Sequence, residues 1–107
     1  MDVLIDWESV PWDTEETRPG IRYKVCVRDG QQVDWSEFSE GFVKEGWCAE
    51  GHLIHVVEGE ASMRFKDGRL LRLRAGDTSI ILAGEADSHR MELAVGERIV
   101  ILGFEQP

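Results

Sequence analysis

The sequence predicts an all-β protein, built as a small antiparallel barrel of about eight or more short strands with no substantial helix. Two observations support this fold class. Eight of the 11 glycines fall after residue 45, spaced 5 to 12 residues apart, which leaves room for a strand and its turn but not for a long helix. Between these glycines, apolar residues alternate with polar ones or form short β-branched runs, as they do in strands.

The first 20 residues form a separate segment in composition. They hold six acidic residues, two of the four tryptophans and two of the three prolines. We expect an ordered but irregular arm that lies on the barrel through Trp7 and Trp12, because acidic disorder rarely carries two tryptophans. The whole chain, 1–107, is then one domain, with the arm at 1–20 and the barrel at 21–107.

The strands of the barrel are predicted from runs of strand-forming residues that end at turn signals. Residues 23–28 form the first and end at Asp29-Gly30, and Val33 and Trp35 mark the second. Later segments end at Gly59, at the hairpin signal Asp67-Gly68 and at further glycines. These later strands are expected at 52–58, 61–66, 71–74, 78–82, 90–95 and 98–104.

Composition excludes several classes of partner and location. The chain has a net charge of -9 and a pI near 4.7, which argues against nucleic acid and against an anionic membrane surface. No apolar run approaches the roughly 18 residues that span a bilayer, and no export signal is visible. Both cysteines are therefore expected as thiols in the cytoplasm, with Cys26 in the core between Val25 and Val27.

Two segments are apolar on both faces, namely residues 80–82 and 99–102. A small barrel buries one face of each, and the other face needs a cover. We expect that cover to be a second copy of the chain in a homodimer. The alternative is that the N-terminal arm folds across this face.

Two glycine-framed segments, GWCAEGHLIHVVEG at 46–59 and GDTSIILAGEADSH at 76–89, resemble the two signature motifs of the cupin superfamily. HVVEGEA is similar to the strand and turn that end the first motif, and GDTSIILAG to the strand of the second. The resemblance covers residues 40–104, with a weaker likeness of the lead-in strands. It implies a double-stranded β-helix, or jelly-roll, barrel.

The same resemblance implies one divalent metal inside the barrel, held by two histidines and a glutamate of the first motif and a histidine of the second. This chain departs from that pattern. Gly46, Cys48 and His52 stand at the three positions of the first motif, and Asp87 stands at the fourth, with His89 two residues later. The usual ligand set is therefore absent.

A different ligand set remains chemically reasonable. Positions 48, 50 and 52 share one strand face, as do 87 and 89. If the two segments pair as the resemblance implies, Cys48, His52 and His89 converge inside the barrel, with Glu50 or Asp87 nearby. Thiolate and imidazole bind zinc, iron or copper, and three protein ligands leave one position open. We expect a divalent zinc, iron or nickel ion as the cofactor.

Each candidate also has a purely structural interpretation. Cys48 can be a small buried hydrophobe, and His89 a polar residue at the barrel mouth. Glu50 and Asp87 are candidates for catalytic acid and base, but exposed carboxylates are commoner. His55 has the opposite strand parity and is assigned to packing or an interface. Trp35 or Phe38 lines the mouth, in a choice that sequence leaves open.

Three functions follow from these features. The first is a metal enzyme acting on a small polar substrate, as an oxygenase, isomerase or lyase. The second is a non-catalytic cupin that binds or senses a small molecule in the barrel without metal. The third is an interaction protein whose acidic, tryptophan-bearing arm docks on a basic partner.

Overall fold

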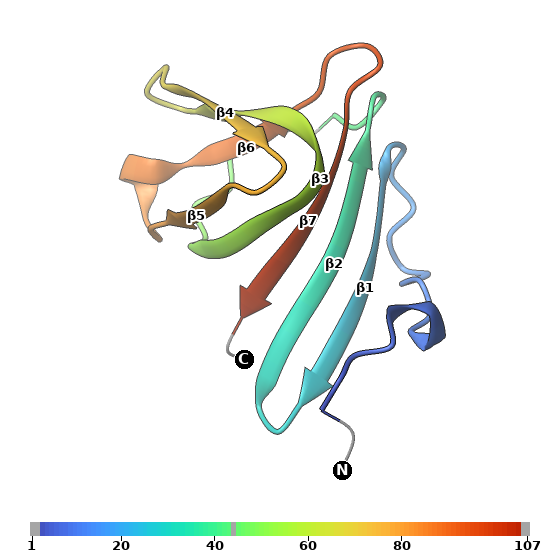
Figure 1. Cartoon of the computed structure of the whole chain (residues 1–107). Helices are drawn as coiled ribbons and strands as arrows, with labels where there is room; N and C mark the ends of the chain where they lie inside the picture. The colour runs from blue at the N-terminus through green and yellow to red at the C-terminus, as the bar shows by residue number, and fades with distance from the viewer. Residues whose placement is uncertain (1–2, 44, 106–107) are drawn as a thin grey trace.

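The computed structural model describes residues 3–43 and 45–105, which form two antiparallel sheets that share a strand and close into a barrel (Figure 1). The first sheet has the order β1-β2-β7-β3-β5, and in the second β4 and β6 flank β3. The strands are β1 (Ile21–Arg28), β2 (Gln31–Ser39), β3 (His52–Phe65), β4 (Leu70–Arg74), β5 (Thr78–Ile81), β6 (His89–Glu92) and β7 (Arg98–Glu105). In the described residues the helical elements are two three-residue 3-10 turns, η1 (Trp7–Ser9) and η2 (Glu85–Asp87). This is the predicted all-β architecture.

Strand β3 belongs to both sheets, and this corrects the expected break at Gly59. Its first half pairs with β5 and β7, and its second half pairs with β4 and β6. A bulge between Val56 and Glu58 lets the strand bend, and Gly59 follows with a φ of +79°. Two of the expected short strands are therefore one bent strand, so the barrel has seven described strands.

The same bulge decides which side chains of β3 enter the core. Even-numbered residues Ile54 and Val56 point inward before the bulge, whereas the odd-numbered Ala61, Met63 and Phe65 point inward after it. The core is completed by buried residues of the other strands: Leu73, Ile81, Ile99 and Ile101. The bulge thus keeps one continuous apolar surface across both sheets.

The N-terminal arm lies on the outer face of β1 and β2 and is anchored by both expected tryptophans. The Trp7 ring packs on Trp35 with centroids 5.7 Å apart, and Lys24 Nζ donates a 2.6 Å hydrogen bond to the Trp7 carbonyl. The Trp12 ring lies 4.0 Å beneath the Arg22 guanidinium carbon. Figure 1 shows this segment, in blue, running beside β1.

Of the two segments that are apolar on both faces, 80–82 and 99–102, the first stays partly uncovered in the single chain. Ile99, Val100 and Ile101 are at most 5% exposed, but Ile80 and Leu82 are 75% and 66% exposed. The arm contacts given above lie on β1 and β2, at the opposite edge of the first sheet from β5. The homodimer therefore stays a prediction, with Ile80 and Leu82 as its expected contacts. In the described part of the chain, no helix is long and apolar enough to cross a membrane.

Candidate metal centre

A cavity of about 210 Å³ lies inside the barrel. Much of its lining is apolar, from Phe38, Phe42, Met63 and Met91, with a smaller number of polar side chains. Phe38 therefore lies where the sequence expected either Phe38 or Trp35. Trp35 has the opposite parity on β2 and packs against Trp7 outside the barrel.

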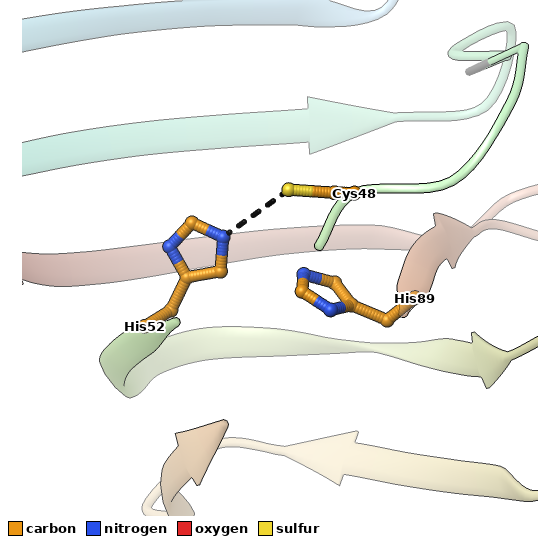
Figure 2. A group of neighbouring side chains, drawn as sticks. All are labelled: Cys48, His52 and His89. Carbon is orange, nitrogen blue, oxygen red and sulfur yellow. Dashed lines mark hydrogen bonds between the residues drawn. The ribbon is translucent and has the colours of Figure 1, made fainter. Parts of the chain in front are cut away.

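Three of the predicted site residues meet at this cavity (Figure 2). Cys48 precedes β3, His52 is the first residue of β3, and His89 is the first residue of β6. Their ligand atoms all lie within 4.8 Å of one another. The backbones of Cys48 and His89 exchange two hydrogen bonds, of 2.9 and 3.0 Å, which fix the two segments side by side. The convergence that strand parity and the resemblance together predicted is therefore observed.

The spacing of two of these groups matches that of metal ligands. Cys48 Sγ lies 3.6 Å from His52 Nε2. In a tetrahedral zinc site, with Zn–S near 2.3 Å and Zn–N near 2.05 Å, the sulfur and nitrogen are about 3.6 Å apart. The other separations, at up to 4.8 Å, need to close by roughly 1 Å to reach similar values.

His89 is held with one ring nitrogen available to a ligand. Its Nδ1 lies 2.9 Å from the carbonyl oxygen of Asp87, and a carbonyl only accepts hydrogen bonds, so Nδ1 carries the proton. The lone pair then belongs to Nε2. A backbone carbonyl behind a metal-binding histidine is a common way to fix its tautomer and orientation. His89 is 4% exposed and contacts the His52 ring edge-on, with centroids 5.2 Å apart.

The donor set fits a divalent transition metal. It offers one thiol and two imidazoles from three different segments, and all three residues are held by backbone pairing. Thiolate and imidazole together suit zinc and the borderline metals iron(II), nickel and copper, whereas magnesium and calcium prefer oxygen donors. Three protein ligands leave a coordination position open toward the cavity, as in catalytic rather than structural sites.

The two candidate acids do not line this cavity. Asp87 lies on η2 and accepts a 2.7 Å hydrogen bond from Arg69 Nη2, beside a separate hollow near β4 and β5. Glu50 is exposed in the segment before β3. Arg69 thus holds the Asp87 carboxylate, and Glu50 is exposed, the commoner state that the sequence analysis gave for both acids.

Two other acids, which sequence analysis did not single out, do line the cavity. Asp34 on β2 and Glu105 at the end of β7 are both bridged by the Gln32 side-chain amide, at 3.0 and 3.4 Å. Burial raises the pKa of Asp34, against the lowering effects of the Gln32 hydrogen bond and of His52. Burial and then repulsion from Asp34 and Glu50 raise the pKa of Glu105.

A signal for Asp34 was present in the sequence. Gln32, Asp34, Ser36 and Phe38 alternate along β2, so the choice of Phe38 over Trp35 for the barrel interior, which the sequence left open, also places Asp34 there. Val33 and Trp35, which are apolar, lie on the opposite face of β2. That face is apolar because the N-terminal arm covers part of it.

Two further residues lie outside the site. Cys26, expected in the core, is only half-buried on β1, because it pairs with Val33 on the outer face of the sheet. His55 lies on the same outer face, where its Nδ1 is 2.7 Å from Thr78 Oγ1. Neither residue has a role in the cavity.

No protein-family model and no curated protein sequence matches the chain. Solved structures do match its fold. The polyketide cyclase RemF from Streptomyces resistomycificus aligns over 100% of this chain and 82% of its own, with a TM-score of 0.80 and 19% identity. A cupin-like protein from Thermotoga maritima aligns over 80% of this chain and 68% of its own, with a TM-score of 0.64 and 22% identity.

A third match is a cupin-2 domain-containing protein from Shewanella frigidimarina. It aligns over 79% of both chains, with a TM-score of 0.62 and 21% identity. At these identities the likeness establishes the architecture and carries no activity across. The barrel described above has the cupin fold.

Proposed function

We propose that this cupin-fold chain holds one divalent transition-metal ion through Cys48, His52 and His89 and binds a small polar molecule in the adjoining cavity. The observation that carries the proposal is the convergence of the three ligand atoms within 4.8 Å at the cavity wall. The tautomer of His89 supports it, because the nitrogen left unprotonated is the one free of the Asp87 carbonyl. Zinc, iron and nickel are the expected ions.

The protein's own residues supply distinct parts of such a site. Cys48 brings a negative charge as thiolate, which lowers the net charge of the bound ion. The carbonyl of Asp87 orients His89, and the apolar lining from Phe38 and Met63 limits the access of water. A bound ion would polarise an oxygen of the ligand or bind it directly at the open position. Oxygenase, isomerase and lyase reactions all use these functions.

Cobalt(II) substitution tests the proposed ligands directly, because thiolate-bound cobalt has a charge-transfer absorption that cobalt bound by nitrogen and oxygen lacks. We expect this band to appear when cobalt(II) is titrated into the purified chain, and to be absent in Cys48→Ser. Cys26→Ser is the matched control, since it removes the other thiol, on the outer face of β1, and should leave the band unchanged. A wild-type spectrum without the band, or a band lost in Cys26→Ser, contradicts the assignment.

The apolar lining favours a second function, a non-catalytic cupin that binds a small molecule without metal. Under this alternative the double variant Cys48→Ala, His52→Ala keeps its affinity for the ligand within a few-fold. Under the first proposal the same variant loses the metal and any affinity that depends on it. Measuring both ligand affinity and metal content of this double variant therefore distinguishes the two functions.

A further inference from the structure

The cavity has an anionic end formed by two neighbouring strands. Asp34 on β2 stands opposite Gly103 on β7, and Gln32 stands opposite Glu105. The Gln32 amide holds both carboxylates. Gly103 brings no side chain, and a Cβ there would lie 3.9 Å from Asp34 Oδ2, so this carboxylate remains open to the cavity.

Among the described residues that line this cavity, the basic side chains are His52, whose charge acts on Asp34, His89 and Arg90. Arg90 is the one Lys or Arg side chain among the described residues that line the cavity. Its guanidinium stacks over Trp47 at 4.4 Å and lies 3.4 Å from the Glu92 carboxylate. Arg90 is thus engaged by Trp47 and Glu92, whereas the carboxylates of Asp34 and Glu105 share the side-chain amide of Gln32.

The rest of the cavity restricts the size and character of an occupant. Phe38, Phe42, Met63 and Met91 provide an apolar wall. The cavity, at about 210 Å³, is smaller than the roughly 300–1,000 Å³ typical of sites for drug-sized ligands. A fitting ligand is small, has an apolar body and carries a positively charged donor that reaches the carboxylates.

We propose that the cavity is selective for a small organic amine, whose ammonium group is bound by Asp34 and Glu105 while its apolar body packs on the Phe38 side. The proposal rests on the proposed function in one respect, that the cavity is a ligand site. An ammonium group satisfies both carboxylates and neutralises their repulsion, which a neutral or anionic group does not. Asp34 is the specificity-determining residue, since it lies further inside the sheet than the exposed Glu105.

Two isosteric probes test the charge preference: 2-phenylethylamine and 2-phenylethanol, titrated into the purified full chain and followed by NMR chemical shifts. Hydrogen bonds to charged groups correspond to roughly tenfold in affinity or more, so we expect the amine to bind at least about tenfold tighter than the alcohol. Asp34→Asn should abolish the difference and leave the alcohol unaffected. Glu85→Gln, at an exposed acid outside the cavity lining, removes the same charge and should keep the preference.

Three outcomes overturn the proposal: equal binding of the two probes, a preference that survives Asp34→Asn, or a preference lost equally in Glu85→Gln. Zinc titrations of the same variants separate this proposal from the metal site. Cys48→Ser should lose zinc affinity and keep the amine preference, whereas Asp34→Asn should keep zinc affinity within a few-fold. If Asp34→Asn weakens zinc binding and leaves the amine preference unchanged, the carboxylates serve the metal and the amine proposal is wrong.

Discussion

Replacement of Gly59 by alanine tests how β3 joins the two sheets. Gly59 has a φ of +79°, and an added Cβ would overlap the carbonyl oxygen of Arg98 and lie 2.8 Å from its carbonyl carbon. The left-handed conformation costs a residue with a Cβ roughly 1–2 kcal/mol. Relief of the overlap requires a shift of the Gly59–Ile99 pair and the loss of at least one backbone hydrogen bond, at about 1–3 kcal/mol. Gly59→Ala should therefore lower the free energy of unfolding by about 3 kcal/mol.

Gly68 in the β3–β4 turn provides a matched control. Its φ is +98°, but no atom beyond its chain neighbours lies within 4 Å of an added Cβ, so Gly68→Ala carries only the conformational cost of roughly 1–2 kcal/mol. Urea denaturation followed by tryptophan fluorescence measures both variants. A difference of 2 kcal/mol corresponds to roughly 8–16 °C in Tm for a domain of this size. Equal destabilisation of the two variants would refute the close packing of β3 against β7 at Gly59.

Three further predictions concern the cavity, the exposed face and the arm. Burial raises the pKa of Asp34, so the cost of ionising its carboxylate is absent below the ordinary pKa of about 3.9 and appears as pH rises through the raised pKa. Asp34→Asn should therefore raise the free energy of unfolding at pH 7 and change it little at pH 3. Urea titrations at both pH values measure this, and an absent gain at pH 7 contradicts it. Sedimentation should show a homodimer that Ile80→Glu converts to monomer, whereas Val95→Glu, at an exposed residue outside the strands, stays dimeric. Trp7→Ala should lower thermal stability by exposing Trp35, and an unchanged Tm would show that the arm contact contributes nothing.

The sequence was most informative about the metal ligands, because strand parity and the two glycine-bounded motifs both point to them. Parity placed Cys48 and His52 on one face, and the resemblance of the two motifs brought His89 to them. The motif frame then identified which residues replace the usual ligands. Convergence of these three residues was therefore predictable, although their separations were not, because those depend on the backbone pairing of Cys48 with His89.

Two features escaped prediction for physical reasons. Gly59 is a turn signal by composition, but the pairing of β3 with β7 reaches Gly59 and its pairing with β4 begins at Glu60, so the strand bends there without ending. Asp34 was overlooked because a half-buried strand ordinarily turns its apolar face inward. On β2 the arm covers part of the apolar face, and the more polar face lines the cavity. Such departures from the ordinary pattern are expected where a strand serves a binding site.

The central claim is that Cys48, His52 and His89 bind one divalent transition-metal ion. Elemental analysis of the chain purified without chelators, followed by zinc titration of any unfilled sites, tests it most directly. We predict one ion of zinc, iron or nickel per chain at saturation, and loss of that ion in His89→Ala but not in the outer-face variant His55→Ala. Protein that is purified without metal and shows no affinity for added zinc or iron(II) would contradict the claim.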